Sequence, residues 1–347
     1  MSSVSGWFKE RLPFDGSKLQ HLTSEPVPYH MKRWWFCLGG TPAYLFMVQV
    51  VTGILLAFYY EASTARAYES VRYITEDAAF GWYLRSVHKW GATLMIATMI
   101  LHQMRVFFTG AYRKPREINW LVGMLILVTT LVIGFTGYSL VFEQLSYWGV
   151  TVGGNISKSV PVVGPLMHDF LFGGAQYGAP TVPRLYVLHA AVLPVVLVLL
   201  LVVHFTVLRI QGVTDFRFSD EDEGKTFRFF PDHVYTEIIA GLVLMILLSA
   251  LATIFPAFMG PKADPLTTPE VIKPEWWFMV TFRWLKLMGI TAAVLSMGLI
   301  VFLMFVWPFV DAWIVRRTRN KEVSTVVGVI AVIAITGLTV WEALVAH

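Results

Sequence analysis

Two apolar segments of the chain each contain two histidines: VHKWGATLMIATMILHQMRVFF at Val87–Phe108 and LYVLHAAVLPVVLVLLLVVHFTVL at Leu185–Leu208. Each segment is long enough to cross the roughly 30 Å hydrocarbon core of a bilayer, which takes about 20 helical residues. Ionisable side chains are costly inside a membrane, so they normally face the interior of a helix bundle and have a partner there. The two segments therefore predict a bundle of membrane helices with four histidines inside it.

The spacing of these histidines places them at two depths. His88 and His102 are 14 residues apart, which advances a helix by about 21 Å and returns to nearly the same face. His189 and His204 are 15 apart, about 60° from that ideal. A lone membrane histidine is as easily explained as a hydrogen-bonded packing residue. Four at matching depths instead predict two haems, ligated by His88 with His189 and by His102 with His204. Iron with two axial histidines has no open site and suits electron transfer.

Composition extends this prediction to the whole chain. Of 347 residues, 56% are hydrophobic and 14% are charged, against about a quarter charged in soluble domains. The net charge of +4 does not indicate a nucleic-acid partner, because basic residues of membrane proteins collect in loops. We therefore expect an all-α membrane protein, in contact with lipid, with seven transmembrane helices. The expected spans are Trp34–Tyr60, Val87–Phe108, Trp120–Phe142, Leu185–Leu208, Tyr235–Pro256, Thr291–Trp313 and Val323–Leu344.

Charged residues predict the orientation and the domain boundaries. Seventeen of the 27 Lys and Arg residues fall in the N-terminal segment and in the loops on its side, which predicts a cytoplasmic N-terminus. Residues 1–33 are typical of a segment on the cytoplasmic membrane surface. The charge-dense residues 213–234 are typical of a linker. This linker separates a four-helix haem-binding bundle at residues 34–212 from a three-helix block at residues 235–347.

Four glycines on the neighbouring segments repeat the 14-residue spacing: Gly39 with Gly53, and Gly123 with Gly137. A flat porphyrin between helices needs residues without side chains where its face or edge passes. Small residues also serve ordinary helix packing in membranes. The shared period favours a haem contact.

Two arginines share a helix face with a predicted ligand. Arg85 lies three residues before His88, and Arg105 lies three residues after His102. Near the membrane boundary, their guanidinium groups would pair with haem propionates. For either arginine alone, snorkelling of a helix-end side chain toward water is the alternative.

The chain resembles cytochrome b of the bc and bf complexes over nearly its whole length. The N-terminal matches are FCLGG at Phe36–Gly40, FGWYLRSVHKW at Phe80–Trp90, GYSL at Gly137–Leu140, RLYVLHAAVLP at Arg184–Pro194 and HFTVLRIQG at His204–Gly212. ADPLTTPEVIKPEWW at Ala263–Trp277 is similar to the family's C-terminal part, a separate subunit in chloroplasts and cyanobacteria. The histidine spacing and the short length resemble the chloroplast-type branch, which menaquinol-oxidising bacterial complexes share. Here both parts are fused.

This resemblance implies a quinol-oxidising complex in a bacterial cytoplasmic membrane. Quinol would be oxidised near the outer surface, giving one electron to a Rieske iron–sulfur protein and then to a c-type cytochrome or a plastocyanin-like acceptor. The other electron would cross through two b-type haems to an inner quinone site, coupled to proton translocation. The resemblance also implies a homodimer of the complex.

In the family, the loop carrying Pro274-Glu275-Trp276-Trp277 caps the quinol oxidation site, and its carboxylate receives a quinol proton. Tryptophans beside Glu275 would desolvate it and raise its pKa toward a useful range. From the residues alone, a carboxylate facing water at a helix end is the simpler reading. Two departures from the family pattern border this site. Trp277 stands where tyrosine is usual, and Val141–Glu143 stands where relatives typically have Pro-Trp and often Asp or Gly.

Cys37 is the only cysteine. A lone cysteine at a helix start is usually a small buried hydrophobe. In the chloroplast-type branch, the matching cysteine holds a third haem by one thioether beside the inner b haem, so the resemblance implies a covalent haem here. Arg209 matches a family arginine that faces the propionate of the inner haem.

Three other functions stay open from the sequence. A hydrogenase or formate dehydrogenase cytochrome b also binds haem in a helix bundle, but it lacks the Pro274–Trp277 loop and the three-helix block. A transporter would use membrane histidines as a proton relay. A redox-inert assembly subunit is the third. Haem absorbance in the purified protein would exclude the transporter and the redox-inert assembly subunit.

Overall fold

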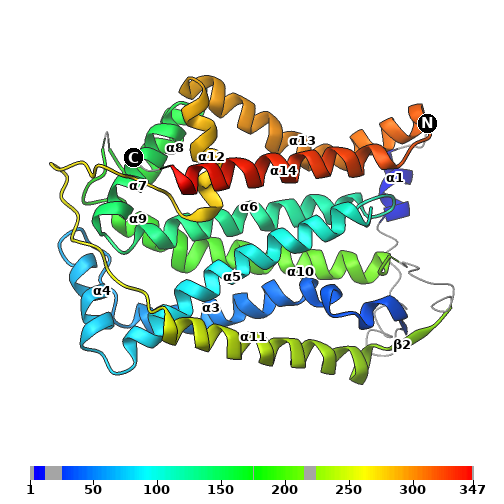
Figure 1. Ribbon diagram of the computed structural model, residues 1–347, viewed down its shortest axis with the longest axis horizontal. Helices are drawn as coiled ribbons and strands as arrows, with labels where there is room; N and C mark the ends of the chain where they lie inside the picture. The colour runs from blue at the N-terminus through cyan, green and yellow to red at the C-terminus, as the bar shows by residue number, and fades with distance from the viewer. Residues whose placement is uncertain (1–3, 12–25, 175, 215–223, 346–347) are drawn as a thin grey trace.

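The computed structural model describes residues 4–11, 26–174, 176–214 and 224–345. Its long helices lie side by side along one axis (Figure 1). Within the described residues, six helices are long and apolar enough to cross a membrane, and Thr41–Ala57 is a shorter apolar helix. The prediction of an all-α membrane protein with seven membrane helices is confirmed. Parts of the expected surface segment (1–3 and 12–25) and of the expected linker (215–223) lie outside the described residues.

The N-terminal bundle contains four apolar helical elements. They are α3 (Thr41–Ala57), α5 (Gly81–Phe108), α6 (Glu117–Ser139) and the continuous run of α9 (Thr181–Val187), the π-helical turn η3 (Leu188–Val192) and α10 (Leu193–Gln211). α3 packs on α5, and α10 packs on α6. Fully buried Leu45, Met124 and Leu197 belong to the apolar core that these helices share. The interior is therefore closed by four helices from one continuous part of the chain.

The π-helical turn explains the uneven spacing of the histidines. A π turn adds one residue to a helical turn, and His189 lies within η3. Pro194 follows at the start of α10 and has no N–H to bond the carbonyl four residues earlier. The extra residue offsets the 60° that a regular helix would leave between His189 and His204. The sequence did not predict this turn.

The C-terminal helices lie along different faces of this bundle. They are α11 (Val234–Ile254), α12 (Trp276–Leu287), α13 (Ile290–Thr318) and α14 (Glu322–Leu344). α11 packs on α5, α13 packs on α6, and α12 packs mainly on α14. In Figure 1, α11 runs along one side of the bundle, while α13 and α14 run along the other.

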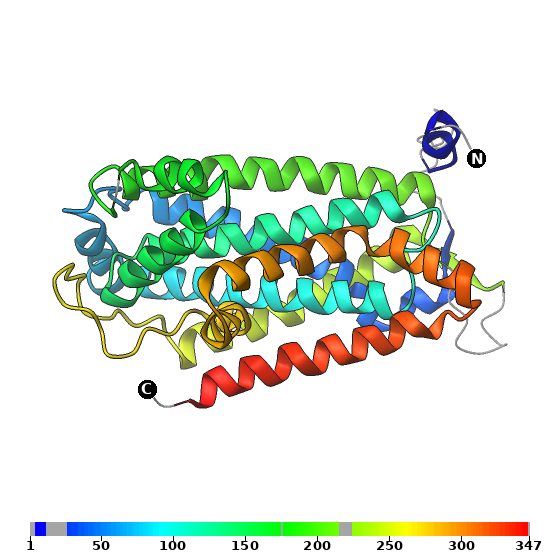
Figure 2. The ribbon, with the colours of Figure 1, turned by 90° about the horizontal axis from the view of Figure 1, so that it is seen from above.

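Shorter elements cover the two ends of the molecule. One end, called the α12 end below, carries α12 with α4 (Ala67–Glu76), α7 (Gln144–Lys158) and α8 (Gly164–Phe172). The opposite α1 end carries α1 (Val4–Arg11), the turns η1 (Tyr29–Lys32), η2 (Trp34–Gly39) and η5 (Phe229–His233), and the antiparallel strands β1 (Pro26–Pro28) and β2 (Thr226–Arg228). The two chain ends lie at opposite ends of the bundle (Figure 2), which agrees with an odd number of crossings. Assigning the α1 end to the cytoplasm stays a prediction.

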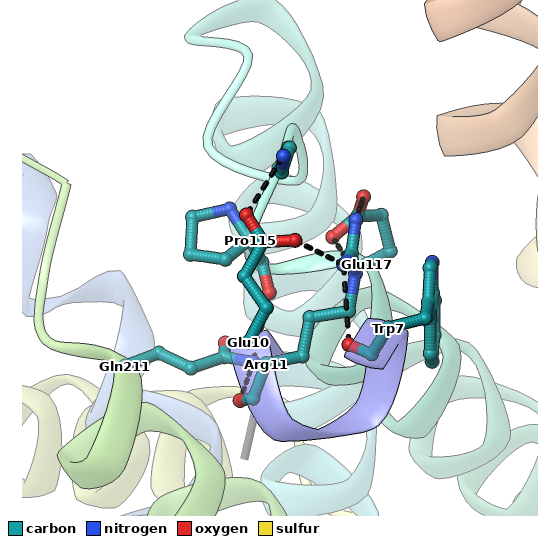
Figure 3. Close-up of polar contacts among 7 residues, drawn as sticks. Trp7, Glu10, Arg11, Pro115, Glu117 and Gln211 are labelled. Carbon is teal, nitrogen blue, oxygen red and sulfur yellow. Dashed lines mark hydrogen bonds and ion pairs between the residues drawn. The ribbon is translucent and has the colours of Figure 1, made fainter. Parts of the chain in front are cut away.

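Helix α1 is held to the bundle by a buried ion pair (Figure 3). Arg11 donates to Glu117 at the start of α6 through Nε at 3.1 Å and Nη2 at 2.7 Å. The side-chain amide of Gln211 donates to the carbonyls of Arg11 and Pro115, both at 2.9 Å. This part of the predicted surface segment is therefore fixed to the ends of α6 and α10.

Candidate functional site

The four predicted ligand histidines form two groups at different depths. His88 on α5 and His189 in η3 have ring centres 6.2 Å apart, with their planes at 74°. A metal–imidazole bond is about 2 Å, and the ring centre lies about 1.1 Å beyond the nitrogen, so rings on opposite faces of one metal have centres about 6.2 Å apart. The observed separation fits an iron bound between the two rings.

The second pair lies in a large cavity at the α1 end. His102 on α5 and His204 on α10 both line a cavity of about 980 Å³. Arg105 and Arg209 line the same cavity. The volume is at the upper limit of ordinary small-molecule sites, about 300–1,000 Å³. The cavity therefore has room for a group as large as a haem beside the two imidazoles.

The four predicted glycines each face a different histidine. A Cβ atom added at any of them would approach the Cε1 atom of an imidazole. These distances would be Gly39–His102 3.5 Å, Gly53–His88 3.3 Å, Gly123–His204 3.7 Å and Gly137–His189 2.5 Å. The expectation was that the glycines make room for the porphyrin. In the structure they make room for the imidazole rings, most tightly at Gly137.

Hydrogen bonds to Nδ1 orient the histidines of the first pair. Nδ1 of His88 lies 2.8 Å from Oγ1 of Thr52, and Nδ1 of His189 lies 3.2 Å from Oγ1 of Thr136. Engaging Nδ1 directs Nε2 toward the space between the rings, the arrangement usual for metal-bound histidine. The sequence analysis missed both threonines. Their signal is a repeated Thr-Gly pair, since each directly precedes a glycine that faces the same histidine.

The predicted arginines occupy different surroundings. Arg85 donates to Oγ1 of Thr75 at 3.2 Å and to the carbonyl of Ala257, so it joins α4 to the loop after α11 at the α12 end. Arg209 lies over the ring of Phe229, 3.9 Å from its centre. The Nε atom of Arg105 is buried with no hydrogen-bond partner within the described part of the chain. A buried, unsatisfied guanidinium nitrogen beside His102 suits an anionic group such as a haem propionate.

Cys37 is buried in η2, next to residues that line the cavity. Burial raises the pKa of its thiol to about 11, and the nearby Glu237 carboxylate adds to the rise. The thiol is therefore protonated at neutral pH.

The Pro274–Trp277 motif ends the loop after α11, and Glu275 is the N-cap residue of α12. Burial raises the pKa of the half-buried Glu275; Lys89 lowers it and Glu143 raises it further. A Cβ atom on Gly134 of α6 would lie 3.6 Å from Cζ2 of Trp277. Gly134 is one helical turn from Gly137, so the motif packs close to the His88–His189 pair.

The tryptophans of this motif pack closely, and one carries an unsatisfied donor. The rings of Trp276 and Trp277 have centres 5.6 Å apart and cross at 82°. Nε1 of Trp277 is buried without a hydrogen-bond partner among the residues described. An indole donates but cannot accept a hydrogen bond, so Trp277 offers no hydrogen-bond acceptor at this position of the motif.

Residues at the second departure from the family pattern, Val141–Glu143, contact the loop that leads to this motif. The Glu143 carboxylate accepts the N–H of Gly260 at 2.6 Å. Gln144 donates its backbone N–H to Pro261 at 2.9 Å and accepts the N–H of Asp264 at 2.6 Å. Glu143, one of the changed residues, and the neighbouring Gln144 therefore contact the 260–264 loop directly.

Comparisons with known proteins identify the family of the chain. The family described as cytochrome b/b6/petB matches residues 22–212, and the one described as cytochrome b (C-terminal)/b6/petD matches residues 262–347. Cytochrome b6 of Heliomicrobium gestii is 44% identical over 60% of this chain and 98% of its own length. The cytochrome bc complex cytochrome b subunit of Chlorobaculum thiosulfatiphilum is 34% identical over 94% of this chain and 78% of its own length.

A solved structure described as a hyperthermophilic respiratory Complex III has the same fold. Its TM-score is 0.81, with 22% identity, over 100% of this chain and 90% of that chain. The chain therefore belongs to the cytochrome b family, as an integral membrane, haem-binding electron-transport protein in which the b6-type part and the C-terminal part are fused.

Proposed function

We propose that this chain is the catalytic cytochrome b subunit of a bc-type quinol oxidoreductase. The observation that carries the proposal is the line of sites through the bundle. It runs from Glu275 at the α12 end, through the His88–His189 pair, to His102 and His204 in the cavity at the α1 end. A helix bundle with redox centres at two depths conducts electrons across a membrane. The match of the C-terminal part favours this function over a hydrogenase-type cytochrome b.

Each part of the chain has a role in this proposal. The four histidines hold two b-type haems, which supply reversible one-electron transfer when bound. Thr52 and Thr136 orient the imidazoles of the first pair, and Arg105 neutralises a propionate. Quinol is oxidised at the α12 end, where Glu275 accepts one of its two protons. Quinone is reduced in the cavity at the α1 end, which faces the cytoplasm.

The proposed partners follow from the electron balance. Quinol releases two electrons, and a b-type haem accepts only one electron at a time. The electron that does not enter the His88–His189 centre needs a one-electron acceptor outside the membrane. A Rieske iron–sulfur protein followed by a c-type cytochrome would supply this route. The resemblance to the family, and not the electron balance, is the ground for proposing a homodimer of the complex.

Reduction of the haems by added quinol tests the proposed function. The purified complex should show a b-type spectrum. Added menaquinol should reduce both haems at least as fast as the complex turns over. An inhibitor that blocks one end should leave reduction of the haems through the other end, so two inhibitors used in turn should reveal two distinct routes. A folded protein without a b-type spectrum would leave the transporter or the assembly subunit. A haem protein that no quinol reduces would exclude a quinol oxidoreductase.

We further propose that Cys37 holds a third haem covalently. The position of η2 beside the 980 Å³ cavity supports this. Cys37 would hold the haem by a thioether, and addition of its S–H to a vinyl group would need no oxidant. Packing is the alternative role of Cys37.

Covalent attachment predicts a result on denaturing gels. When haem-attachment machinery is present, the wild-type band should stain for haem peroxidase activity, and Cys37→Ala should remove the stain completely. The b-type spectrum should survive in the variant, because Cys37 is no ligand of those haems. An unstained wild-type band would return Cys37 to a packing role.

A further inference from the structure

Helix α12 carries Glu275 at its start but packs mainly on α14. α14 in turn meets α5 near the α1 end, where a Cβ atom on Gly328 would clash with the ring of Phe107. Figure 2 shows α14 along the edge of the bundle, with α12 beside its C-terminal half. The position of Glu275 relative to the haem-binding bundle therefore depends on how α12 is fixed to α14.

A buried ion cluster fixes the second half of α12. Glu342 of α14 is 0% exposed. One of its carboxylate oxygens lies 2.7 Å from Nζ of Lys286, and the other lies 3.7 Å from Nη1 of Arg283. Arg283 also lies 3.6 Å from the ring centre of Trp341. Two cations three residues apart on one face of α12 thus meet one carboxylate of α14.

A separate contact fixes the loop on the N-terminal side of the Pro274–Trp277 motif. Nζ of Lys273, directly before Pro274, donates to the carbonyls of Ala343 at 3.2 Å and Val345 at 2.8 Å. Carbonyls in the last turn of a helix have no partner within the helix, and a cation suits the negative end of its dipole. Residues 341–345, called the α14 anchor below, therefore hold the chain on both sides of the Pro274–Trp277 motif.

We propose that the α14 anchor positions Glu275 for quinol oxidation, with Glu342 as its main positioning residue. This inference rests on the proposed function of the α12 end. Proton transfer needs the acceptor within hydrogen-bond reach, and a displacement of about 1 Å can slow a reaction by about 10²-fold. Removing the charge of Glu342 removes the attraction that sets the register of α12, so Glu275 moves relative to the groups that face it.

Those groups predict the pH signature of the displacement. Lys89 of α5, Tyr138 of α6 and Glu143 before α7 interact electrostatically with Glu275, and burial raises the pKa of its carboxyl. If α12 shifts, Glu275 becomes more hydrated and its pKa falls toward the ordinary value. Quinol oxidation depends on the ionised carboxylate, so the acid limb of the rate profile should move to lower pH. A loss of stability alone would leave that limb in place.

The test uses the complete complex with Glu342→Gln. Quinol oxidation at the α12 end should slow on the order of tenfold, mainly in kcat, with the acid limb displaced to lower pH. Haem reduction through the α1 end should keep its wild-type rate. Glu322→Gln, at the other end of α14 and exposed, is the matched control and should change neither route. A second change, Lys286→Gln, should restore part of the lost rate, because it removes the positive charge that the Glu342 carboxylate balanced.

Several outcomes would overturn the positioning role. One is equal slowing of both routes, and another is slower oxidation with an unmoved acid limb. If Glu342→Gln does not assemble, Lys273→Gln removes only the bonds to the α14 carbonyls, and it should slow oxidation severalfold with the same pH displacement. No change in that variant would count against the anchor. If Glu275→Gln leaves quinol oxidation unchanged, the proposed function of the motif is wrong. If Glu275→Gln slows oxidation but the anchor variants leave it unchanged, only the positioning role is wrong.

Discussion

The His204→Leu variant should lose about half of the b-type haem absorbance. Leucine cannot ligate iron, so the haem at the α1 end has one axial partner left and dissociates on purification. The His88–His189 pair lies at another depth and keeps its own contacts, with ring centres 6.2 Å apart. Reduced-minus-oxidised difference spectra, together with haem content per chain, measure the loss. The remaining signal should titrate as a single component instead of two.

Two glycine variants are the controls for this result. Gly123→Ala places a Cβ atom 3.7 Å from Cε1 of His204, an ordinary contact, and should keep both haems. Gly137→Ala places it 2.5 Å from Cε1 of His189 and should disturb the haem at the α12 end instead. If His204→Leu retains two haems, His204 is not a ligand. Loss of both haems would show that the second pair is required for the bundle to assemble.

Hydropathy and histidine spacing predicted the fold, because a bilayer imposes strong rules on sequence. A span needs about 20 apolar residues, so the long helices follow from composition alone. The histidine-bearing segments are the second and the fourth of the predicted spans, so they must cross the membrane in the same direction. The histidine pairs then followed from the helical rise of about 1.5 Å per residue. Each of these steps uses a local pattern of the chain.

The parts that sequence did not predict depend on local exceptions or on distant contacts. The π turn at His189 breaks the regular period on which the prediction relied. Thr52 and Thr136 orient the ligands, yet their contacts join residues that are 36 and 53 positions apart. The bond from Glu143 to the Gly260 N–H spans 117 positions. Periodicity carries no information on pairs of this kind, so the support of the α12 end emerged only from the structure.

The Glu275→Gln variant should oxidise quinol at the α12 end about 10- to 100-fold more slowly, toward the low end for a lost general base. Glutamine keeps the shape and the hydrogen-bonding capacity but cannot accept the proton. Burial raises the pKa of Glu275, with Lys89 opposing and Glu143 adding to the rise. Only the ionised form is a base, so the wild-type rate should fall as pH drops through this raised pKa. The variant should lack that acid limb.

Timing haem reduction by quinol with each end blocked in turn separates the explanations. With the α1 end blocked, electrons enter through the Glu275 site, and the variant should be slow. With the α12 end blocked, haem in the cavity should equilibrate with the quinone pool at the wild-type rate, because His102 and His204 lie away from the altered carboxylate. Equal slowing by both routes would give Glu275 a role in folding or assembly. An unchanged rate through the α12 end at every pH would remove Glu275 from proton transfer. Glu143 would then be the next carboxylate to test, since it interacts electrostatically with Glu275.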